Sequence, residues 1–254
     1  DVYTKLALKG NQYTVEFRVY DDAVAYRFCG ARKDSVNVKD ETVEYNFAGD
    51  PNTWTPWIAG EEQGERYSCS FESYYTETKV SQMPSKRLSI LPLLADMGNG
   101  VKVAVTDVGD LDYPGMYVHS NFKNGNGLKG EFPGYPDLKN SDLNGQGYAN
   151  FVKLFRKDYI ARVGGKQPLS WKVAVITEKD AQLADCDIVR KLCDGTSKGD
   201  YSWVKTGKVA WDWWNALNVT GLDFASGMNT PTYKHYIDFA AANKLEYIII
   251  DDGW

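Results

Sequence analysis

The last residues of the sequence form the group with the clearest capacity for chemistry. Asp251, Asp252 and Trp254 follow directly after the apolar run 247–250. Carboxylates accept hydrogen bonds, so an adjacent pair could bind the donor groups of a ligand. In parallel α/β folds, ligands bind at the carboxyl ends of the strands. We therefore treat the tip 251–254 as a candidate ligand site. The alternative is that one or both aspartates cap a following helix.

A strand, a helix and a second strand must position this tip. Residues 247–250 are apolar and rich in β-branched side chains, which is typical of a parallel strand covered on both faces. Thr230 and Pro231 predict a helix start, with threonine as N-cap and proline at the first helical position. With a first strand over 208–214, this makes one β-α-β unit with a right-handed crossover. The helix has one apolar face, formed by Tyr233, Tyr236, Ile237 and Ala240.

A single β-α-β unit cannot bury its own apolar faces, which bears on how the whole chain is organised. A (β/α)8 barrel takes about 250 residues for its eight repeats. Only two of its strands fit between residue 206 and residue 254, so we expect a fragment that stops inside a barrel domain. The alternative is that the unit packs as an appendix on the preceding β domain.

Composition excludes some classes of partner. The 254 residues carry a net charge of -5, without the basic stripe that a nucleic-acid backbone requires, so we expect no nucleic-acid partner. No segment reaches the roughly 18 apolar residues of a membrane span. The 8 Trp, 17 Tyr and 10 Phe would suit stacking on sugar rings, and would equally suit packing in a large β-sandwich.

Four cysteines, namely Cys29, Cys69, Cys186 and Cys193, fit neither a metal-binding pattern nor a dense disulfide scaffold. Cys186 and Cys193 could form a bridge or remain two thiols.

Residues 1–205 alternate between apolar and polar in short segments, which predicts an antiparallel β-sandwich. The clearest signal is a hairpin, in which Asp21 and Asp22 form the turn between strands 13–20 and 23–28. The composition of the glycine-rich stretch 121–147 is typical of a loop or a hairpin. We expect a helix near 179–193. Further strands are predicted over 42–47, 70–78, 88–94, 101–106, 158–163 and 171–176.

Three segments together resemble glycoside hydrolase family 97, which contains α-glucosidases and α-galactosidases. They are the Trp-Asp-Trp-Trp motif within 208–214, the Tyr-Ile-Asp-Phe-Ala-Ala motif that begins at Tyr236, and the Asp-Asp-Gly-Trp motif that ends at Trp254. A fourth match is the run 103–116, which ends in Tyr-Pro-Gly-Met.

The resemblance implies an N-terminal β-super-sandwich, a central (β/α)8 barrel and a small C-terminal β domain. The expected fold is therefore mainly β, with a sandwich over 1–205, its beginning missing, and the first two strands of a truncated barrel over 206–254. The family's catalytic acid, and its base or nucleophile, come from later strands. We therefore expect no catalytic residue in this chain.

The resemblance also suggests roles at the tip. Asp251 and Asp252 correspond to positions that bind sugar hydroxyls in related barrels, where a carboxylate can accept bidentate hydrogen bonds. Trp254 could stack on the sugar or pack in the barrel. We place Trp211 with the substrate-binding residues, although sealing the barrel and the sandwich interface is the alternative. Strand alternation would put Trp211 and Trp213 on one face, and Asp212 and Trp214 on the other.

The family binds Ca²⁺ through glutamates, one of them supplied by the sandwich, and the matching position here is Asp107. Aspartate keeps a hard oxygen ligand but shortens its reach by one methylene, which matters when ligands lie at about 2.3–2.6 Å. We expect Ca²⁺ in the full-length enzyme, with binding to this fragment in doubt. The alternative is that Asp107 is a surface turn residue beside Asp110 and Asp112.

The resulting expectation is a fragment of a secreted or periplasmic exo-acting α-glycosidase, inactive by itself. The whole enzyme would hydrolyse terminal α-linked glucose or galactose, and its partners would be an oligosaccharide or α-glycoside substrate and the remainder of the barrel. Whether it inverts or retains stays open, because that depends on the separation of carboxylates that this chain lacks. Two rivals remain, namely a non-catalytic sugar-binding β-sandwich and a sandwich that only buttresses a barrel.

Overall fold

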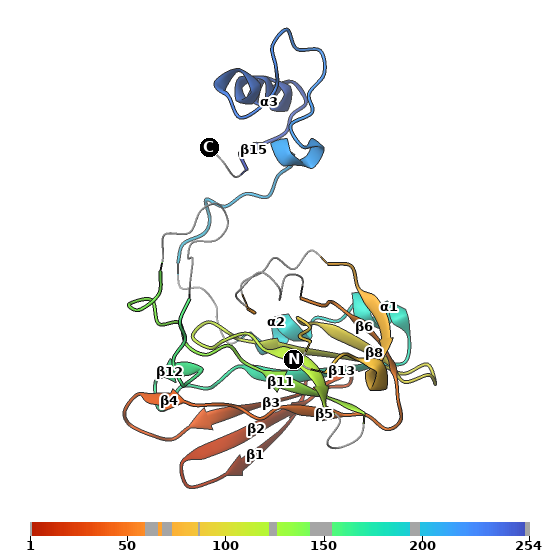
Figure 1. The fold of residues 1–254 in the computed structure, drawn as a ribbon, viewed down its shortest axis with the longest axis vertical. Coiled ribbons are helices and arrows are strands. Elements are labelled where there is room, and N and C mark those ends of the chain that lie inside the picture. The colour runs from red at the N-terminus through yellow and green to blue at the C-terminus, as the bar shows by residue number, and fades with distance from the viewer. Residues whose placement is uncertain are drawn as a thin grey trace. The chain divides into compact units, whose positions relative to one another are not determined.

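The computed structural model describes residues 2–58, 66–67, 73–85, 87–121, 126–142, 154–193 and 199–251. The chain forms two compact units, Asp1–Gly195 and Thr196–Trp254, each described here by itself (Figure 1). The boundary that we expected near Lys205 lies within the second unit. Within the described ranges, no helix is long and apolar enough to cross a membrane.

The first unit is built on one antiparallel sheet of eight strands, which confirms the prediction of a mainly β fold (Figure 1). The hairpin predicted around Asp21 and Asp22 joins its second and third strands, with Val19 paired to Val24. In spatial order the strands are β1 (Thr4–Lys9), β2 (Tyr13–Val19), β3 (Ala23–Gly30), β13 (Trp171–Thr177), β9 (Lys102–Val108), β8 (Leu93–Asp96), β6 (Asn52–Thr55) and β7 (Thr76–Lys79).

Smaller sheets and short helices complete this unit. A three-stranded sheet has the order β10 (Tyr117–Asn121), β11 (Gly127–Glu131), β5 (Glu44–Asn46), and β12 (Ala161–Val163) pairs with β4 (Val36–Val38). One apolar core joins Leu93 and Val105 of the large sheet to Val118 and Leu128 of the three-stranded sheet, as expected for a sandwich. A second core joins the opposite side of β13 to the short helices. These helices are α1 (Asp180–Ala184) and α2 (Ile188–Leu192), whereas Val80 of the 3-10 helix η2 (Val80–Gln82) packs in the first core.

Strand β1 lies at one edge of the large sheet, and all six of its residues are exposed. Leu6 and Leu8 are each about half exposed, on the opposite side of the strand from Lys5 and Lys9. The strand is attached to the sheet through its ladder with β2.

Several predicted elements of the sandwich differ in detail from the structure; the strand expected over 158–163, for example, is present only over Ala161–Val163. The strand expected over 88–94 begins only at Leu93, because Pro92 has no backbone N–H to donate to a ladder. Before it, Ser89 makes isolated bridges only. The helix expected over 179–193 is broken into α1 and α2, since Asp185 ends the first helix and Asp187 is the N-cap of the second. Of the strand expected over 70–78, residues 70–72 lie outside the described ranges.

The second unit is a β-α-β unit, as predicted. Its elements are β14 (Val209–Trp211), the 3-10 turn η3 (Asp212–Asn215), α3 (Thr230–Ala242) and β15 (Tyr247–Ile249). The two strands are parallel, with Trp211 paired to Ile249. The N-cap is Asn229 rather than Thr230, because the Asn229 Oδ1 accepts from the Thr232 backbone N–H at 3.0 Å, and asparagine caps at least as well as threonine.

The apolar faces of this second unit remain largely open. On α3, Ala240 is buried but Ile237 is half exposed, and Ile249 and Ile250 of the second strand region are exposed as well. The covering of both strand faces that we predicted is therefore not present within residues 199–251, because α3 supplies only one layer.

Candidate functional site

The acidic tip is held by contacts between the ends of the two parallel strands. The indole Nε1–H of Trp211 donates to Oδ2 of Asp251 at 2.8 Å. The backbone N–H of Asp251 points at the carboxylate of Asp212, with both oxygens at 3.3 Å. Asp251 is thus held at its side chain and at its backbone by two consecutive residues of the neighbouring chain segment.

The local structure explains why these residues meet. The parallel register pairs Trp211 with Ile249, so its indole can reach Asp251 two residues further along. After Trp211 the chain leaves the strand and enters η3, which directs Asp212 inward until only 1% of it is exposed. The hydroxyl of Tyr236 on α3 donates to the Asp212 carbonyl at 3.4 Å and to Oδ1 of Asn215 at 2.8 Å, which attaches the turn to the helix.

The tip concentrates negative charge beside aromatic groups. Burial raises the pKa of Tyr233 on α3, and the negative charges of Asp212 and Asp251 act in the same direction. Asp251 is half-buried, so its carboxylate can both take support from the protein and reach a ligand. Asp252 and Trp254 lie outside the described residues, so their predicted roles stay predictions.

The predicted alternation of the four residues 211–214 is wrong. Because η3 is a 3-10 turn, residues three apart lie above one another. Trp211 therefore approaches Trp214, with ring centroids 6.3 Å apart and planes at 51°. Trp213 and Trp214 are exposed within the described part of the second unit. Sequence alternation missed this because the strand ends at Trp211.

The predicted metal ligand Asp107 lies on β9 and is engaged in holding a turn. Its Oδ2 accepts from the backbone N–H of Met116 at 2.7 Å, at the end of the Tyr-Pro-Gly-Met segment. Burial raises the pKa of Asp107, while the Met116 amide and the charge of Lys172 oppose that shift. Asp110 hydrogen-bonds to Asp107, and burial together with the Asp107 charge raises the pKa of Asp110 to about 6. One proton on the pair relieves their repulsion at moderately acidic pH.

The cation nearest this acidic group is a lysine that sequence reasoning missed. Lys172 is opposite Asp107 in the ladder and is 1% exposed. Its Nζ lies 2.5 Å from Ser170 Oγ and 3.6 Å from Glu41 Oε2. Glu41 Oε2 also accepts from the Tyr113 hydroxyl at 2.9 Å. The available signal was the parity of strand 171–176, which puts Lys172 on the face opposite Trp171 and Val173.

These residues do not fit a Ca²⁺ site by themselves. Ca²⁺ takes six to eight oxygen ligands, commonly with several carboxylates. No group of three or more acidic, histidine or cysteine side chains in the described ranges is arranged to hold a metal. Asp107 is occupied by an amide donor and faces an ammonium, so it offers at most one ligand and only by giving up present partners.

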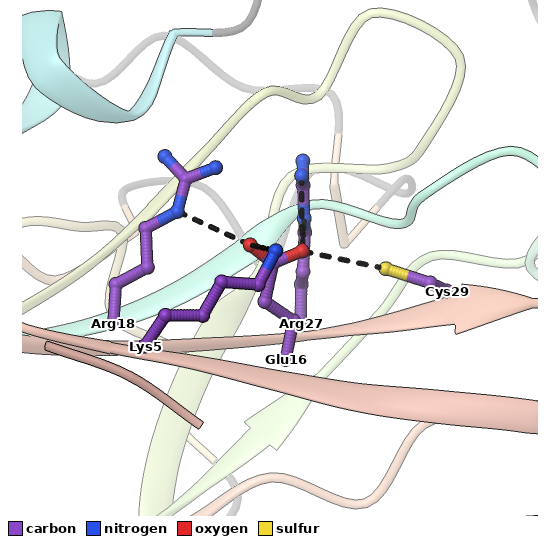
Figure 2. A network of polar contacts seen from close by, with 5 residues as sticks. All are labelled: Lys5, Glu16, Arg18, Arg27 and Cys29. Carbon is purple, nitrogen blue, oxygen red and sulfur yellow. Dashed lines mark hydrogen bonds and ion pairs between the residues drawn. The ribbon is translucent and has the colours of Figure 1, made fainter. Parts of the chain in front are cut away.

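A second charged cluster surrounds Glu16 on β2 (Figure 2). Lys5 Nζ lies 3.0 Å and Arg18 Nε 3.2 Å from its Oε1, and Arg27 approaches Oε2 at 3.3 Å. Both guanidinium groups also lie over the ring of Trp171. Cys29 donates weakly to Glu16 at 3.8 Å. The cluster therefore joins β1, β2, β3 and β13, which is a structural role.

Among the described cysteines, Cys29, Cys186 and Cys193 are free thiols, so the bridge considered for Cys186 and Cys193 is not formed. Cys69 lies outside the described residues.

A cavity of about 350 Å³ opens in the sandwich between the ends of β2 and β3 and the β4–β12 pair. Its walls are mainly apolar, with Asp40, Glu41, Thr42 and Gln167 as polar exceptions. The aromatic rings that line this cavity, which the rival sugar-binding sandwich would use for stacking, are those of Tyr13 and Phe28. The apolar walls are Tyr13, Phe28, Val36, Val38, Val163 and Leu169.

Comparison with known families gives two matches in consecutive order. Residues 2–194 match the model described as "Glycosyl-hydrolase 97 N-terminal", and residues 213–254 match "Glycoside hydrolase 97". The division between them agrees with the two compact units.

Two curated relatives align over nearly the whole chain. A "Retaining alpha-galactosidase" of Bacteroides thetaiotaomicron is 39% identical over 256 residues, covering 99% of this chain and 38% of the relative. A "Probable retaining alpha-galactosidase" of Streptomyces bingchenggensis is 21% identical over 245 residues, covering 96% of this chain and 32% of the relative. The chain thus spans less than two fifths of their length.

Solved structures share the fold. A glycoside hydrolase family 97 enzyme from Pseudoalteromonas sp. strain K8, in complex with acarbose, superposes with a TM-score of 0.69 at 19% identity, covering 100% of this chain and 39% of that one. A beta-arabinopyranosidase superposes with a TM-score of 0.72 at 21% identity, covering 100% and 42%.

Proposed function

The chain belongs to glycoside hydrolase family 97, and from this premise we propose that it is a substrate-binding part of an exo-acting α-glycosidase. The observation that carries the proposal is the family match on both units combined with the parallel pair β14–β15, which presents Asp251 at a strand end. Ligands bind at that end in barrel enzymes. In the whole enzyme, this unit forms the first two strands of the barrel, and the remainder covers the exposed Ile237, Ile249 and Ile250.

For the substrate, we propose a terminal α-linked galactose, with α-linked glucose as the alternative. Support comes from the relative at 39% identity, whose name is that of a retaining α-galactosidase. We propose retention for the same reason, with both catalytic carboxylates in residues beyond this chain. Asp251, Asp252 and Trp254 bind the sugar, and the chain by itself does not hydrolyse glycosides.

The residues of this chain bind and orient rather than react. Asp251 accepts hydrogen bonds from sugar hydroxyls, which fixes the position of the ring relative to groups supplied by the remainder of the barrel. A bound Ca²⁺ would supply positive charge next to the substrate. We propose that residues outside this chain hold it, because the surroundings of Asp107 do not fit the ion. From the family resemblance alone, we propose a periplasmic or secreted location.

The test compares two polypeptides on aryl α-galactoside and aryl α-glucoside, namely residues 1–254 and the full-length protein that contains them. We expect turnover from the full-length protein, faster on the galactoside, and none from 1–254. Clear turnover by 1–254 would place the catalytic carboxylates within this chain.

The rival sugar-binding sandwich predicts something different. Tryptophan fluorescence of residues 1–254 would then titrate with oligosaccharide, and the response would survive Asp251→Ala. A response that is absent, or that disappears with Asp251→Ala, favours the glycosidase proposal.

A further inference from the structure

Asp251 is restrained at two points by neighbouring residues of one segment. Trp211 holds a carboxylate oxygen and Asp212 holds the backbone N–H. We infer that Trp211 and Asp212 are positioning residues that fix the direction of the Asp251 carboxylate toward the substrate. This inference rests on the proposed function, in which Asp251 binds sugar hydroxyls.

The hydrogen bond from the Trp211 indole to Asp251 indicates how Trp211 acts. The indole N–H lies in the plane of the ring, and it is the only polar group of the side chain. A donor 2.8 Å from Asp251 Oδ2 therefore turns the edge of the ring, rather than its face, toward Asp251. The Trp211 ring also lies beside that of Trp214, with centroids 6.3 Å apart and planes tilted by 51°. Trp211 thus acts on the sugar through Asp251, rather than by contacting the sugar itself as a substrate-binding residue.

Asp212 supplies the second restraint. Its carboxylate is almost fully buried, and a buried charge is retained only where polar partners compensate it. Both oxygens share the backbone N–H of Asp251, which makes this a charge-assisted contact. The strand end is thereby fixed before a ligand arrives.

Two restraints are needed because of how aspartate moves. Its side chain rotates about two torsions, so a fixed backbone alone leaves the carboxylate direction undetermined. The indole contact removes that freedom. Binding a ligand to a carboxylate that is already oriented costs less side-chain conformational entropy than binding to a carboxylate that must first become ordered.

The test uses the full-length enzyme and kcat/KM for an aryl α-galactoside. Trp211→Phe keeps an aromatic ring but removes the N–H, and Trp213→Phe is the matched control on the exposed neighbour. We expect Trp211→Phe to lower kcat/KM about 10-fold, as for a lost hydrogen bond to a charged group, and Trp213→Phe by less than about 2-fold. Asp212→Asn is a second variant, with an expected loss of about 3- to 10-fold.

The discriminating measurement is whether the losses of kcat/KM from Trp211→Phe and Asp212→Asn add to the loss from Asp251→Asn. In that background, Trp211→Phe and Asp212→Asn should each cost less than about 2-fold, because there is no longer an oriented carboxylate to position. If Trp211→Phe and Asp212→Asn lower kcat/KM by the same factors in the Asp251→Asn background as in the wild type, the inference is overturned while the role of Asp251 stands. If Asp251→Asn alone leaves kcat/KM unchanged, the proposed sugar contact fails and the inference fails with it. Thermal unfolding of each variant separates these outcomes from misfolding.

Discussion

The ammonium of Lys172 lies 3.6 Å from Glu41 Oε2 inside the sandwich, where both side chains are almost fully buried. The rings of Tyr113 and Phe132 lie 5.4 and 5.1 Å from the same nitrogen. Glu41 Oε1 has no hydrogen-bond partner within the described residues. Lys172 therefore neutralises an acidic cluster that includes Asp107.

Removing this ammonium should destabilise the sandwich strongly. Lys172→Met keeps the length of the side chain but leaves the Glu41 charge buried without its counterion, and we expect a loss of about 3–5 kcal/mol in the free energy of unfolding. Urea unfolding measures it. The matched control is Lys39→Met, whose ion pair with Asp158 is exposed at 3.9 Å and should contribute nothing measurable. Equal losses in the two variants would contradict the role of Lys172.

Glu16 should stabilise the sheet in a pH-dependent way. Burial by itself would raise its pKa, but the hydrogen bond from Lys5 and the charges of Arg27, Lys5 and Arg18 outweigh this, so the pKa is lowered. Its stabilisation is therefore present above the ordinary glutamate pKa of about 4.3 and lost as the pH falls through the folded pKa. The difference in unfolding free energy between the wild type and Glu16→Gln should shrink between about pH 5 and pH 3. A constant difference would exclude an electrostatic origin.

Asp110 should have the opposite pH dependence. Its pKa is raised to about 6, so the protonated form is favoured by the fold. Stability linked to this proton is fully present below the unfolded pKa of about 3.9 and is lost as the pH rises through 6. We expect Asp110→Asn to be more stable than the wild type at pH 7 and to lose this advantage near pH 4. Urea unfolding at the two pH values gives the sign, and an advantage that is equal at both would contradict the shift.

Asp107 should matter for the turn more than for a metal. Asp107→Ala removes the acceptor of the Met116 amide, and we expect a stability loss of about 1 kcal/mol relative to Asp107→Asn, which keeps an acceptor and relieves the same repulsion with Asp110. The Ca²⁺ affinity of the full-length enzyme, measured by calorimetry after removal of bound metal, should change by less than about 2-fold. A loss of 10-fold or more would make Asp107 a ligand.

The sequence is sufficient to predict the parallel strands and the position of Asp251, because an apolar β-branched run followed by acidic residues is a local pattern. It does not predict the contact of Asp212 with Asp251, since the strand ends at Trp211 and η3 replaces the two-residue period. Nor does it predict the burial of Lys172, because lysine is ordinarily a surface residue and its partners lie far along the chain. Local sequence patterns predict the strands and helices, whereas the contacts of Asp212 and Lys172 depend on tertiary packing.

Strand β1 presents an open backbone edge, with all its side chains reachable from solvent. Such an edge can recruit a strand from another molecule, which is how native chains begin to aggregate. Lys9 places positive charge along it, and Lys5 adds to this although its ammonium also pairs with Glu16 at 3.0 Å, so two copies that approached edge to edge would meet electrostatic repulsion. We expect these charges to disfavour edge-to-edge association of two copies of the chain.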